Sequence, residues 1–438
     1  MRLKCLGAGQ EVGRSGILIL GSDNVLFDYG LKLHPKYRDK KNKDKYRITH
    51  EEKYTEAPLK IKEKLDAVIL SHAHLDHSGD IPALYKNDNP NLFVTEGTLD
   101  LSNLLWKDTL KIARFERRDP PYYRDHMIEA NKSAFYLDLK QTVEITDNSK
   151  LTFYDAGHIV GSTISVLEMD NKKIMYTGDF RNTRSSLFNG YDNDLPEVDY
   201  LIIESTYGDA DHKPREQVEK EVIDAVKATL NRKGIVMLAA FAIERSQELI
   251  ALLYKNNIKA PIYVDGMGTK ATRIFLEYPE YFKDHREFKK AVNSVELVTN
   301  HRMRKEMAKD SSPKVIITTA GMLEGGPIMF YLKQYGDNKN NLLMTTGYQV
   351  EGTNGHRLHT TGKMFIDDEL FEPLCEIKHN SLSAHPDQGE LIELVNLVNP
   401  KKVICIHGDP DAITKFRKEL KDEGYETEAP KVGDTITL

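Results

Sequence analysis

The chain has 438 residues, of which 40% are hydrophobic and 29% are charged; this composition excludes a disordered chain, and the length favours two domains. A formal net charge of −6 argues against a generally basic nucleic-acid binder, so a polyanionic substrate would need a local basic cleft or bound metal ions. With only three cysteines, no signal-peptide pattern and no apolar run of bilayer length, we expect a cytoplasmic protein that does not enter a membrane.

The N-terminal half is dominated by short β-rich runs that end on glycine or aspartate. Examples are "NVLFDYG", "DAVILSHAH", "KIMYTGDF" and "DYLIIESTYGD". The basic run "KYRDKKNKDKYR", residues 36–47, has no apolar period and is interpreted as a solvated surface loop, with substrate steering as a minor alternative. The stretch "GTLDLSNLLWKDTLKIARF" is predicted to be a helix with Thr98 or Asp100 as its N-cap.

Strands and helices alternate clearly from about Asp209 onward. "HKPREQVEKEVIDAVKATL" and "ERSQELIALLYKN" have helical periodicity, whereas "GIVMLAAFA", "APIYVDG" and "KVIITTAG" are apolar strands. This alternation is the βαβ pattern of a parallel sheet covered by its own helices. Further on, "KKVICIHGD" and "KVGDTITL" are predicted to be strands of the remaining structure. Overall the sequence predicts an α/β protein in which polar residues follow the strands.

The stretch "LSHAHLDHSGD" follows an apolar strand and is rich in potential metal ligands. His72 and His74 at this spacing suit a strand end or loop, and Asp76 and His77 follow after a tight step. Imidazole and carboxylate together favour Zn²⁺ or a neighbouring first-row metal. Because no cysteine is among them, a catalytic site with an open position is favoured over a closed structural site.

Four residues cannot complete two metal sites, so further ligands are expected at other strand ends. His158 in "AGHIVGS", Asp179 in "YTGDF" and His407 in "CIHGD" each follow an apolar run. Asp28 in "VLFDYG" also ends a strand, where its carboxylate would accept a hydrogen bond from a ligand histidine. Each of these residues alone has an ordinary explanation, but together they indicate a metal site.

These motifs carry a resemblance to a known family. "SHAHLDH", "AGHIVGS" and "YTGDF" resemble the motifs of the metallo-β-lactamase hydrolase fold, and "IIESTYGD", "NSLSAHPD" and "CIHGD" resemble those of its β-CASP branch of nucleic-acid-processing enzymes. The likeness covers nearly the whole chain and is closest to archaeal homologues of the endonuclease subunit of the cleavage and polyadenylation specificity factor. Some of those relatives carry RNA-binding KH domains ahead of the hydrolase. This sequence begins in the hydrolase motifs, so that contact is not expected.

The resemblance implies an αββα metallo-β-lactamase sandwich with an inserted parallel-sheet β-CASP domain. Residues 1–207 and 362–438 would form the hydrolase domain, and residues 208–361 would form the insert, with substrate passing through the cleft between them. It also implies two Zn²⁺ ions per chain, one held by His72, His74 and His158 and the other by Asp76, His77 and His407, with Asp179 bridging them. His385 would be the general acid that protonates the departing 3′-oxygen, and Glu204 would orient His385 and raise its pKa.

Two other motifs are predicted to contact RNA. Arg245 in "FAIERSQEL" begins a helix after a strand, where it would receive a phosphate; an ordinary exposed helix arginine is the alternative. The family resembled has a small residue before this arginine, where this chain has Glu244. Gly325 and Gly326 in "MLEGGP" would let the backbone approach RNA closely, or would form the turn that starts a helix at the following proline.

The predicted activity is that of a zinc-dependent ribonuclease, which cleaves single-stranded RNA mainly internally and leaves 5′-phosphate and 3′-hydroxyl ends. Three alternatives stay open. They are a 5′→3′ exonuclease like ribonuclease J, a DNA nuclease, and a non-catalytic scaffold in an RNA-processing complex. A homodimer and membership of an RNA-processing or decay complex are also implied by the resemblance.

Overall fold

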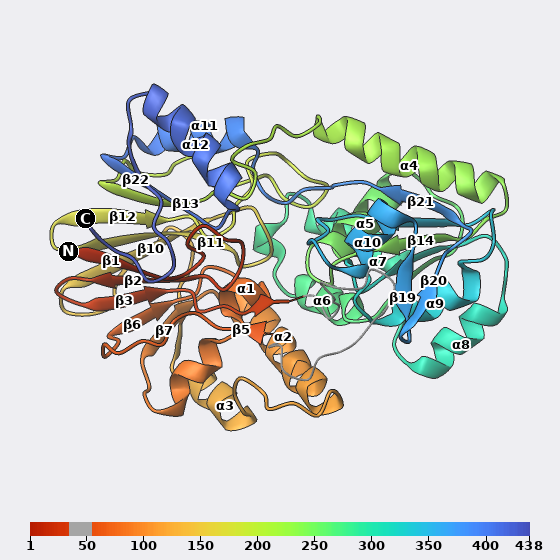
Figure 1. The fold of residues 1–438 in the computed structure, drawn as a ribbon, viewed down its shortest axis with the longest axis horizontal. Coiled ribbons are helices and arrows are strands. Elements are labelled where there is room, and N and C mark those ends of the chain that lie inside the picture. The colour runs from red at the N-terminus through yellow and green to blue at the C-terminus, as the bar shows by residue number, and fades with distance from the viewer. Residues whose placement is uncertain (35–54) are drawn as a thin grey trace.

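The structure, a computed structural model, describes residues 1–34 and 55–438, and the basic run at residues 36–47 lies outside the described residues. The chain forms two lobes, which Figure 1 shows side by side. One lobe contains two stacked sheets between helices, and the other contains a parallel sheet with its own helices. The predicted α/β architecture, a sandwich with an inserted parallel-sheet domain, is therefore confirmed.

The sandwich lobe is built from two seven-stranded sheets. The first has the order β24 (Thr435–Thr437), β1 (Arg2–Gly7), β2 (Gly16–Leu20), β3 (Asn24–Phe27), β6 (Ala67–Ile69), β7 (Asn91–Val94) and β8 (Ala134–Tyr136). The second has the order β23 (Glu426–Glu428), β22 (Lys402–Ile406), β13 (Tyr200–Glu204), β12 (Lys172–Tyr176), β11 (Thr163–Met169), β10 (Ser149–Asp155) and β9 (Thr142–Glu144). Side chains such as Ile17 and Phe27 of the first sheet pack with Phe153 and Ile202 of the second in one buried core. The two sheets therefore share their inner faces.

Helices cover the outer faces of this sandwich. Helices α2 (Glu96–Phe115) and α3 (Arg124–Lys132) lie on the first sheet, and α11 (Gln388–Val398) and α12 (Pro410–Asp422) lie on the second (Figure 1). The N-cap of α2 is Thr95 rather than the predicted Thr98 or Asp100, because the Thr95 hydroxyl accepts a hydrogen bond from the Thr98 amide at 3.3 Å. The helix therefore begins closer to β7 than its apolar periodicity indicates.

The second lobe is organised around a six-stranded sheet in which every pairing is parallel. Its order is β16 (Glu296–Val298), β15 (Ile262–Asp265), β17 (Val315–Thr318), β14 (Val236–Ala239), β18 (Leu342–Thr345) and β21 (Glu376–His379). Its helices are α4 (Arg215–Asn231), α5 (Arg245–Lys255), α6 (Gly268–Phe275), α7 (His285–Asn293), α8 (His301–Lys309), α9 (Pro327–Tyr335) and α10 (Asn354–Thr361). Because β21 pairs with β18, the chain remains in this sheet beyond residue 361, where the sequence predicts the end of the insert. The return to the sandwich comes after His379.

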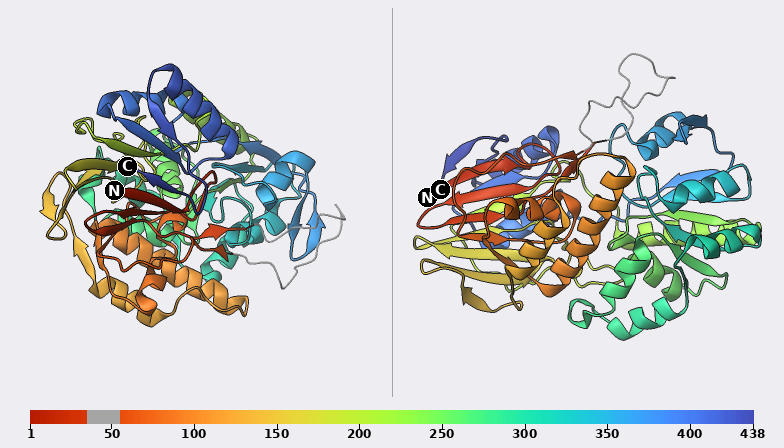
Figure 2. Two further views of the ribbon diagram at one scale, coloured as in Figure 1. Left: turned by 60° about the vertical axis from the view of Figure 1, so that its left-hand side comes forward. Right: turned by 90° about the horizontal axis from the view of Figure 1, so that it is seen from below.

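Within residues 1–34 and 55–438, the chain crosses between the lobes twice, once between β13 and α4 and once between β21 and α11. Both views in Figure 2 show the two chain ends together on the sandwich, where β24 pairs with β1. The two crossings between the lobes mean that the segments before and after the insertion both belong to the sandwich lobe.

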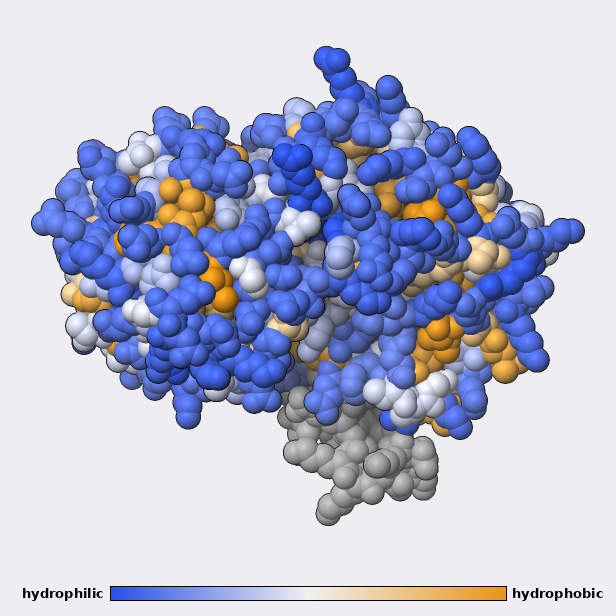
Figure 3. Space-filling view, turned by 90° about the horizontal axis from the view of Figure 1, so that it is seen from above, coloured by the Kyte–Doolittle hydropathy of each residue, from blue (hydrophilic) through white to orange (hydrophobic). Residues whose placement is uncertain are grey.

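Figure 3 shows a mainly hydrophilic face with apolar atoms in small separate groups. Among the described residues, none of the helices combines the length and apolar character needed to span a membrane.

Candidate metal centre

The histidine-rich loop leaves β6 and turns sharply into the short helix α1 (Leu75–Ser78). The turn is closed by backbone hydrogen bonds from the amides of His77 and Ser78 to the carbonyl of His74, at 3.0 and 2.8 Å. Gly30, after β3, permits this packing, because a Cβ atom there would lie 1.8 Å from the carbonyl oxygen of Asp76. The loop is thus held against the neighbouring strand end with its histidines buried between the sheets.

The other predicted ligands arrive from three strand ends of the second sheet. His158 follows β10, Asp179 follows β12 and His407 follows β22. All are at most 2% exposed. The donor atoms form two compact groups, the first comprising His72, His74, His158 and Asp179 and the second comprising Asp76, His77 and His407, each with all atoms within 4.8 Å of one another. The structure thus brings every predicted metal ligand into one place.

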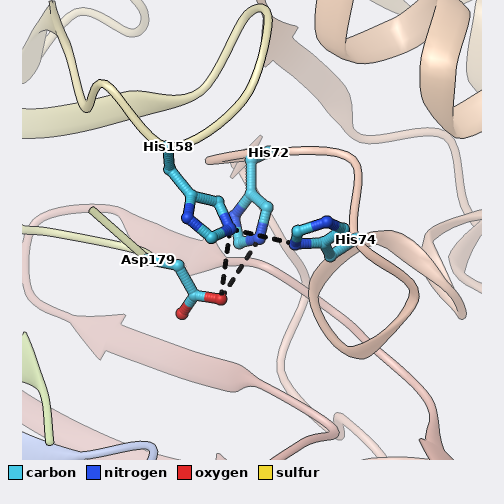
Figure 4. Close-up of side chains that lie close together, drawn as sticks. All are labelled: His72, His74, His158 and Asp179. Carbon is cyan, nitrogen blue, oxygen red and sulfur yellow. Dashed lines mark hydrogen bonds and ion pairs between the residues drawn. The ribbon is translucent and has the colours of Figure 1, made fainter. Parts of the chain in front are cut away.

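Asp179 joins these two groups, because its two carboxylate oxygens face different histidines. Oδ2 lies 3.4 Å from His72 Nε2 and 3.8 Å from His158 Nε2, as Figure 4 shows. Oδ1 lies 3.2 Å from His77 Nε2 and 3.5 Å from His407 Nδ1. A carboxylate in this position is suited to serve as a ligand shared between two cations.

The chemistry of these donors fits a bound metal. His72 Nε2 and Asp179 Oδ1 are buried and form no hydrogen bond, although buried polar atoms rarely go without one. Burial and the neighbouring His72 lower the pKa of His74 to about 3, which leaves the imidazole neutral, as a metal ligand must be. Burial lowers the pKa of His77, but Asp179 and Asp28 outweigh it and hold that pKa well above its usual range. The site therefore combines a neutral imidazole at His74 with local negative charge that favours a cation.

A buried carboxylate fixes the orientation of the ligand loop. Asp28 is fully buried, and its Oδ2 atom accepts hydrogen bonds from His77 Nδ1, the Ser71 hydroxyl and the Tyr176 hydroxyl, each at 2.7 Å. The Ser71 oxygen in turn lies 3.0 Å from His72 Nδ1. Because the Nδ1 atoms are engaged, the Nε2 atoms of both histidines point to Asp179. The predicted position of Asp28 behind a ligand histidine is the one that the structure shows.

The roles of Ser71 and Tyr176 are not apparent from the sequence motifs. Ser71 directly precedes the first histidine, and Tyr176 is the last residue of β12, just before Asp179. Their adjacency to ligand residues is the signal that would have pointed to them. Both hydroxyls supply hydrogen bonds that a buried carboxylate requires.

His385 pairs with the buried Glu204 beside the predicted metal ligands. His385 Nδ1 lies 2.8 Å from Glu204 Oε2, and Glu204 is 1% exposed. The Phe180 amide and the Thr206 hydroxyl donate to the same carboxylate, at 3.0 and 2.7 Å. Burial lowers the pKa of His385, but Glu204 and then Asp179 outweigh it and raise that pKa to about 9. His385 is therefore protonated at neutral pH and is poised to give up a proton.

His385 also borders a cavity of about 440 Å³ between the two lobes. Its lining includes four cationic side chains, those of Arg181, Arg184, Lys213 and Arg215, together with Ser381 and Ser383. The acidic residues Asp211, Glu221, Asp387 and Glu390 line it as well. Four cationic and four acidic side chains thus line the cavity beside His385.

The structure keeps the predicted RNA-contact residues apart from these donor groups. Arg245 is 5% exposed and is engaged inside the protein, with its Nη1 2.8 Å from Glu248 and its Nη2 3.2 Å from Glu244. Gly326 is the N-cap of α9 at φ 75°, where a Cβ atom would lie 2.7 Å from the Thr319 carbonyl oxygen. Gly325, at φ 121°, has no neighbour within 4 Å of a Cβ atom placed there. The structure therefore uses Gly326 in a helix-start turn, whereas the space around Gly325 is open.

Three protein-family descriptions match successive parts of the chain. Residues 24–237 match the description "Beta-lactamase superfamily domain", and residues 246–358 match "Beta-Casp domain". Residues 374–430 match "Zn-dependent metallo-hydrolase RNA specificity domain". These matches span the histidine loop, the parallel sheet and the segment that carries His385 and His407.

Curated relatives align over nearly the whole chain. A "Probable RNase MJ4" of Methanocaldococcus jannaschii is 36% identical over 440 residues, which cover 99% of each chain. The "Transcription termination factor FttA" of Pyrococcus abyssi is 34% identical over 100% of this chain and 71% of its own. The "RNase aCSPSF2" of Saccharolobus solfataricus is 32% identical over 100% of this chain and 85% of its own.

A solved structure shares the fold at low sequence identity. It is a protein of unknown function from Enterococcus faecalis, which is 15% identical, covers 100% of this chain and 99% of its own, and has a TM-score of 0.62. That likeness supports the two-lobe architecture alone.

Proposed function

This chain belongs to the metallo-hydrolases of the β-lactamase superfamily that carry a β-CASP domain, and from that premise we propose that it is a zinc-dependent ribonuclease. Its substrate is single-stranded RNA, which it cleaves mainly at internal phosphodiester bonds. The observation that carries the proposal is the arrangement around Asp179, whose two oxygens face two groups of histidines beside a His385 that is hydrogen-bonded to Glu204.

The donor sets suit two Zn²⁺ ions. His72, His74 and His158 would hold one ion, and Asp76, His77 and His407 would hold the other, with Asp179 shared between them. Ions bound there would lower the pKa of an attacking water and neutralise the charge on the phosphate oxygens. Asp28 keeps His77 in the orientation that presents Nε2 to this site.

His385 supplies the proton that the leaving group needs. Its Nδ1 atom is bonded to Glu204, so the Nε2 proton is the one available for the departing 3′-oxygen. Glu204 stabilises the charged imidazole, and the Phe180 amide and Thr206 hydroxyl hold the Glu204 carboxylate in place. Protonation of the 3′-oxygen yields a 3′-hydroxyl, and the other fragment carries a 5′-phosphate.

Substrate binding depends on the cavity between the lobes. Arg184 and Lys213 line its wall near His385, where they would neutralise backbone phosphates of a single strand. The contacts predicted for Arg245, Gly325 and Gly326 stay predictions. So do the division at residues 207 and 361, the homodimer, the larger RNA-processing complex and the cytoplasmic location.

A circular single-stranded RNA distinguishes the candidate activities. We would incubate the protein and Zn²⁺ with the circle, with the same RNA linearised with a 5′-monophosphate, and with a circular single-stranded DNA. Asp179→Ala serves as the control for contaminating nucleases. Cutting of the RNA circle by the wild type alone supports the proposal, since a circle offers no end.

The other outcomes each reassign the protein. Degradation of only the linear RNA indicates a 5′→3′ exonuclease, and cutting of the DNA circle indicates a DNA nuclease. Silence on all three substrates, with metal bound, indicates a scaffold. The product ends are checked by extension with poly(A) polymerase, which requires the 3′-hydroxyl that the proposal expects.

A further inference from the structure

Glu244 has a backbone conformation that a non-glycine residue rarely adopts. It precedes α5 with φ 73° and ψ −61°. The Arg245 amide donates to the Ile243 carbonyl at 3.0 Å, so Glu244 is the central residue of a γ-turn with positive φ. That form of the turn is rare and strained, and glycine would adopt it without a side-chain penalty. A side chain retained at such a position calls for a function.

The carboxylate of Glu244 is also costly to bury. Glu244 is 2% exposed, and burial raises its pKa to about 7 despite the neighbouring arginines Arg245 and Arg181. Glu248, one turn further along α5, is fully buried as well. Two carboxylates therefore lie inside the interface between the lobes, where each requires a partner to remain charged.

Their partners are arginines, one of which, Arg181, reaches across that interface from the sandwich lobe. Arg181 stands two residues after Asp179, and its Nη2 donates to Glu244 Oε1 at 3.1 Å. Arg215, at the start of α4, is ion-paired with Glu248. Arg181 is 3% exposed, so neither solvent nor a surface charge competes for its guanidinium. The carboxylates thereby fix the directions in which both guanidinium groups donate their remaining hydrogens.

Both arginines converge on a single backbone atom. The Ser383 carbonyl oxygen accepts from Arg181 Nη2 at 2.9 Å and from Arg215 Nη1 at 3.2 Å. Ser383 begins the turn that carries the proton donor, since its hydroxyl accepts from the His385 amide at 3.1 Å. The intervening Ala384 carbonyl accepts from His158 Nδ1 at 2.9 Å. A shift of this turn would therefore move His385 relative to the metal donors, of which His158 is one.

We propose that Glu244 is a positioning residue that acts through Arg181 to hold the Ser383–His385 turn in its reactive place. The second lobe thereby controls the proton donor of the first, and the strained γ-turn is what brings the carboxylate into reach. This role of Glu244 rests on the proposed function, because it takes His385 as the group that protonates the leaving oxygen.

Glu244→Gly is the decisive variant, since it removes the carboxylate and relieves the backbone strain at once. Lys233→Gly is the matched control, because Lys233 is an exposed residue with φ 62° after α4 that lies outside this cluster. Glu244→Gln retains an oxygen that can accept from Arg181 and tests for partial rescue. All variants are compared with the wild type, loaded with Zn²⁺, by bound-metal content, thermal unfolding and single-turnover cleavage of a single-stranded RNA.

Glu244→Gly is expected to retain its metal, and relief of the backbone strain should offset part of the stability lost when Arg181 and Arg245 lose a buried partner. Its cleavage rate at saturating RNA should fall about tenfold to a hundredfold, with little change in KM, because a misplaced donor slows chemistry rather than binding. Glu244→Gln should lie between Glu244→Gly and the wild type, and Lys233→Gly should match the wild type. Hydrogen exchange should accelerate at the amides of residues 383–385 in Glu244→Gly and not in Lys233→Gly.

A Glu244→Gly rate within about twofold of wild type would overturn the role of Glu244. So would a loss of metal or of thermal stability in proportion to the loss of rate, which would mark a purely structural residue. If the wild type itself cleaves no RNA, the proposed function fails. Hydrogen exchange alone then tests the positioning role of Glu244. Faster exchange at residues 383–385 then upholds the positioning role, and unchanged exchange overturns it.

Discussion

His385 donates its Nδ1 hydrogen to Glu204 at 2.8 Å. In the sequence, the two residues stand on opposite sides of the inserted lobe. Glu204 ends a strand before the insertion, and His385 belongs to the segment that returns after it. The charge of the carboxylate raises the pKa of the imidazole to about 9 although burial lowers it. The pair therefore couples the acidity of the proton donor to a contact that only the folded chain makes.

Glu204→Gln should shift the alkaline limb of the pH–rate profile. A general acid works only while protonated, so the wild-type rate should fall as pH rises through the His385 pKa of about 9. Without the carboxylate, burial acts with less opposition and lowers that pKa, so the fall should begin at a lower pH. Cleavage rates at saturating RNA over the range of about pH 6 to 10 measure the shift. An unmoved limb with metal content unchanged would contradict the assignment of His385.

His385→Ala should separate metal binding from catalysis. His385 belongs to neither group of metal donors, so the variant should retain its metal while its cleavage rate falls roughly 100- to 10,000-fold. Asp179→Ala should lose metal and activity together, because Asp179 faces both groups of histidines. Elemental analysis after dialysis, beside the cleavage assay, makes the comparison. Loss of metal from His385→Ala would indicate that His385 is a metal ligand rather than the proton donor.

Asp28→Asn should weaken metal binding without touching a ligand. The Oδ2 atom of Asp28 accepts from His77 Nδ1, from Ser71 and from Tyr176, and loss of its charge should lower metal affinity about 10- to 100-fold. Tyr176→Phe, which removes one of these three hydrogen bonds, should have a smaller effect. Competition with a chromogenic chelator gives both affinities. Equal affinities for Asp28→Asn and the wild type would rule out this carboxylate as the support of His77.

Asp80→Asn should remove part of the pH dependence of stability. Burial raises the pKa of the Asp80 carboxyl to about 8, well above the value in an unfolded chain. The folded state then binds a proton that the unfolded state releases, so this contribution is complete below about pH 4 and is lost as pH rises through about 8, at roughly 1.4 kcal/mol per pH unit. Chemical denaturation of the metal-free protein at about pH 5 and about pH 8 should show a smaller difference for the variant. An equal difference in both proteins would contradict the shift.

The sequence was most informative where function imposes a local motif. The histidine loop and the single residues at other strand ends could be predicted, because each follows an apolar run and has the chemistry of a metal ligand. The N-cap at Thr95 and the extension of the parallel sheet to β21 could not, because they depend on contacts that are set by packing. The contacts of two arginines with the Ser383 carbonyl could not be predicted from the local sequence either, because they join segments separated by up to 202 residues.

The inserted lobe also has a consequence for synthesis of the protein on the ribosome. Asp76 and His77 emerge early, whereas His407 and His385 emerge only after the whole inserted lobe has been made. A nascent chain therefore carries the first histidines without the proton donor or the last ligand. A nuclease built in this order cannot attack the messenger from which it is being translated until the second lobe is complete.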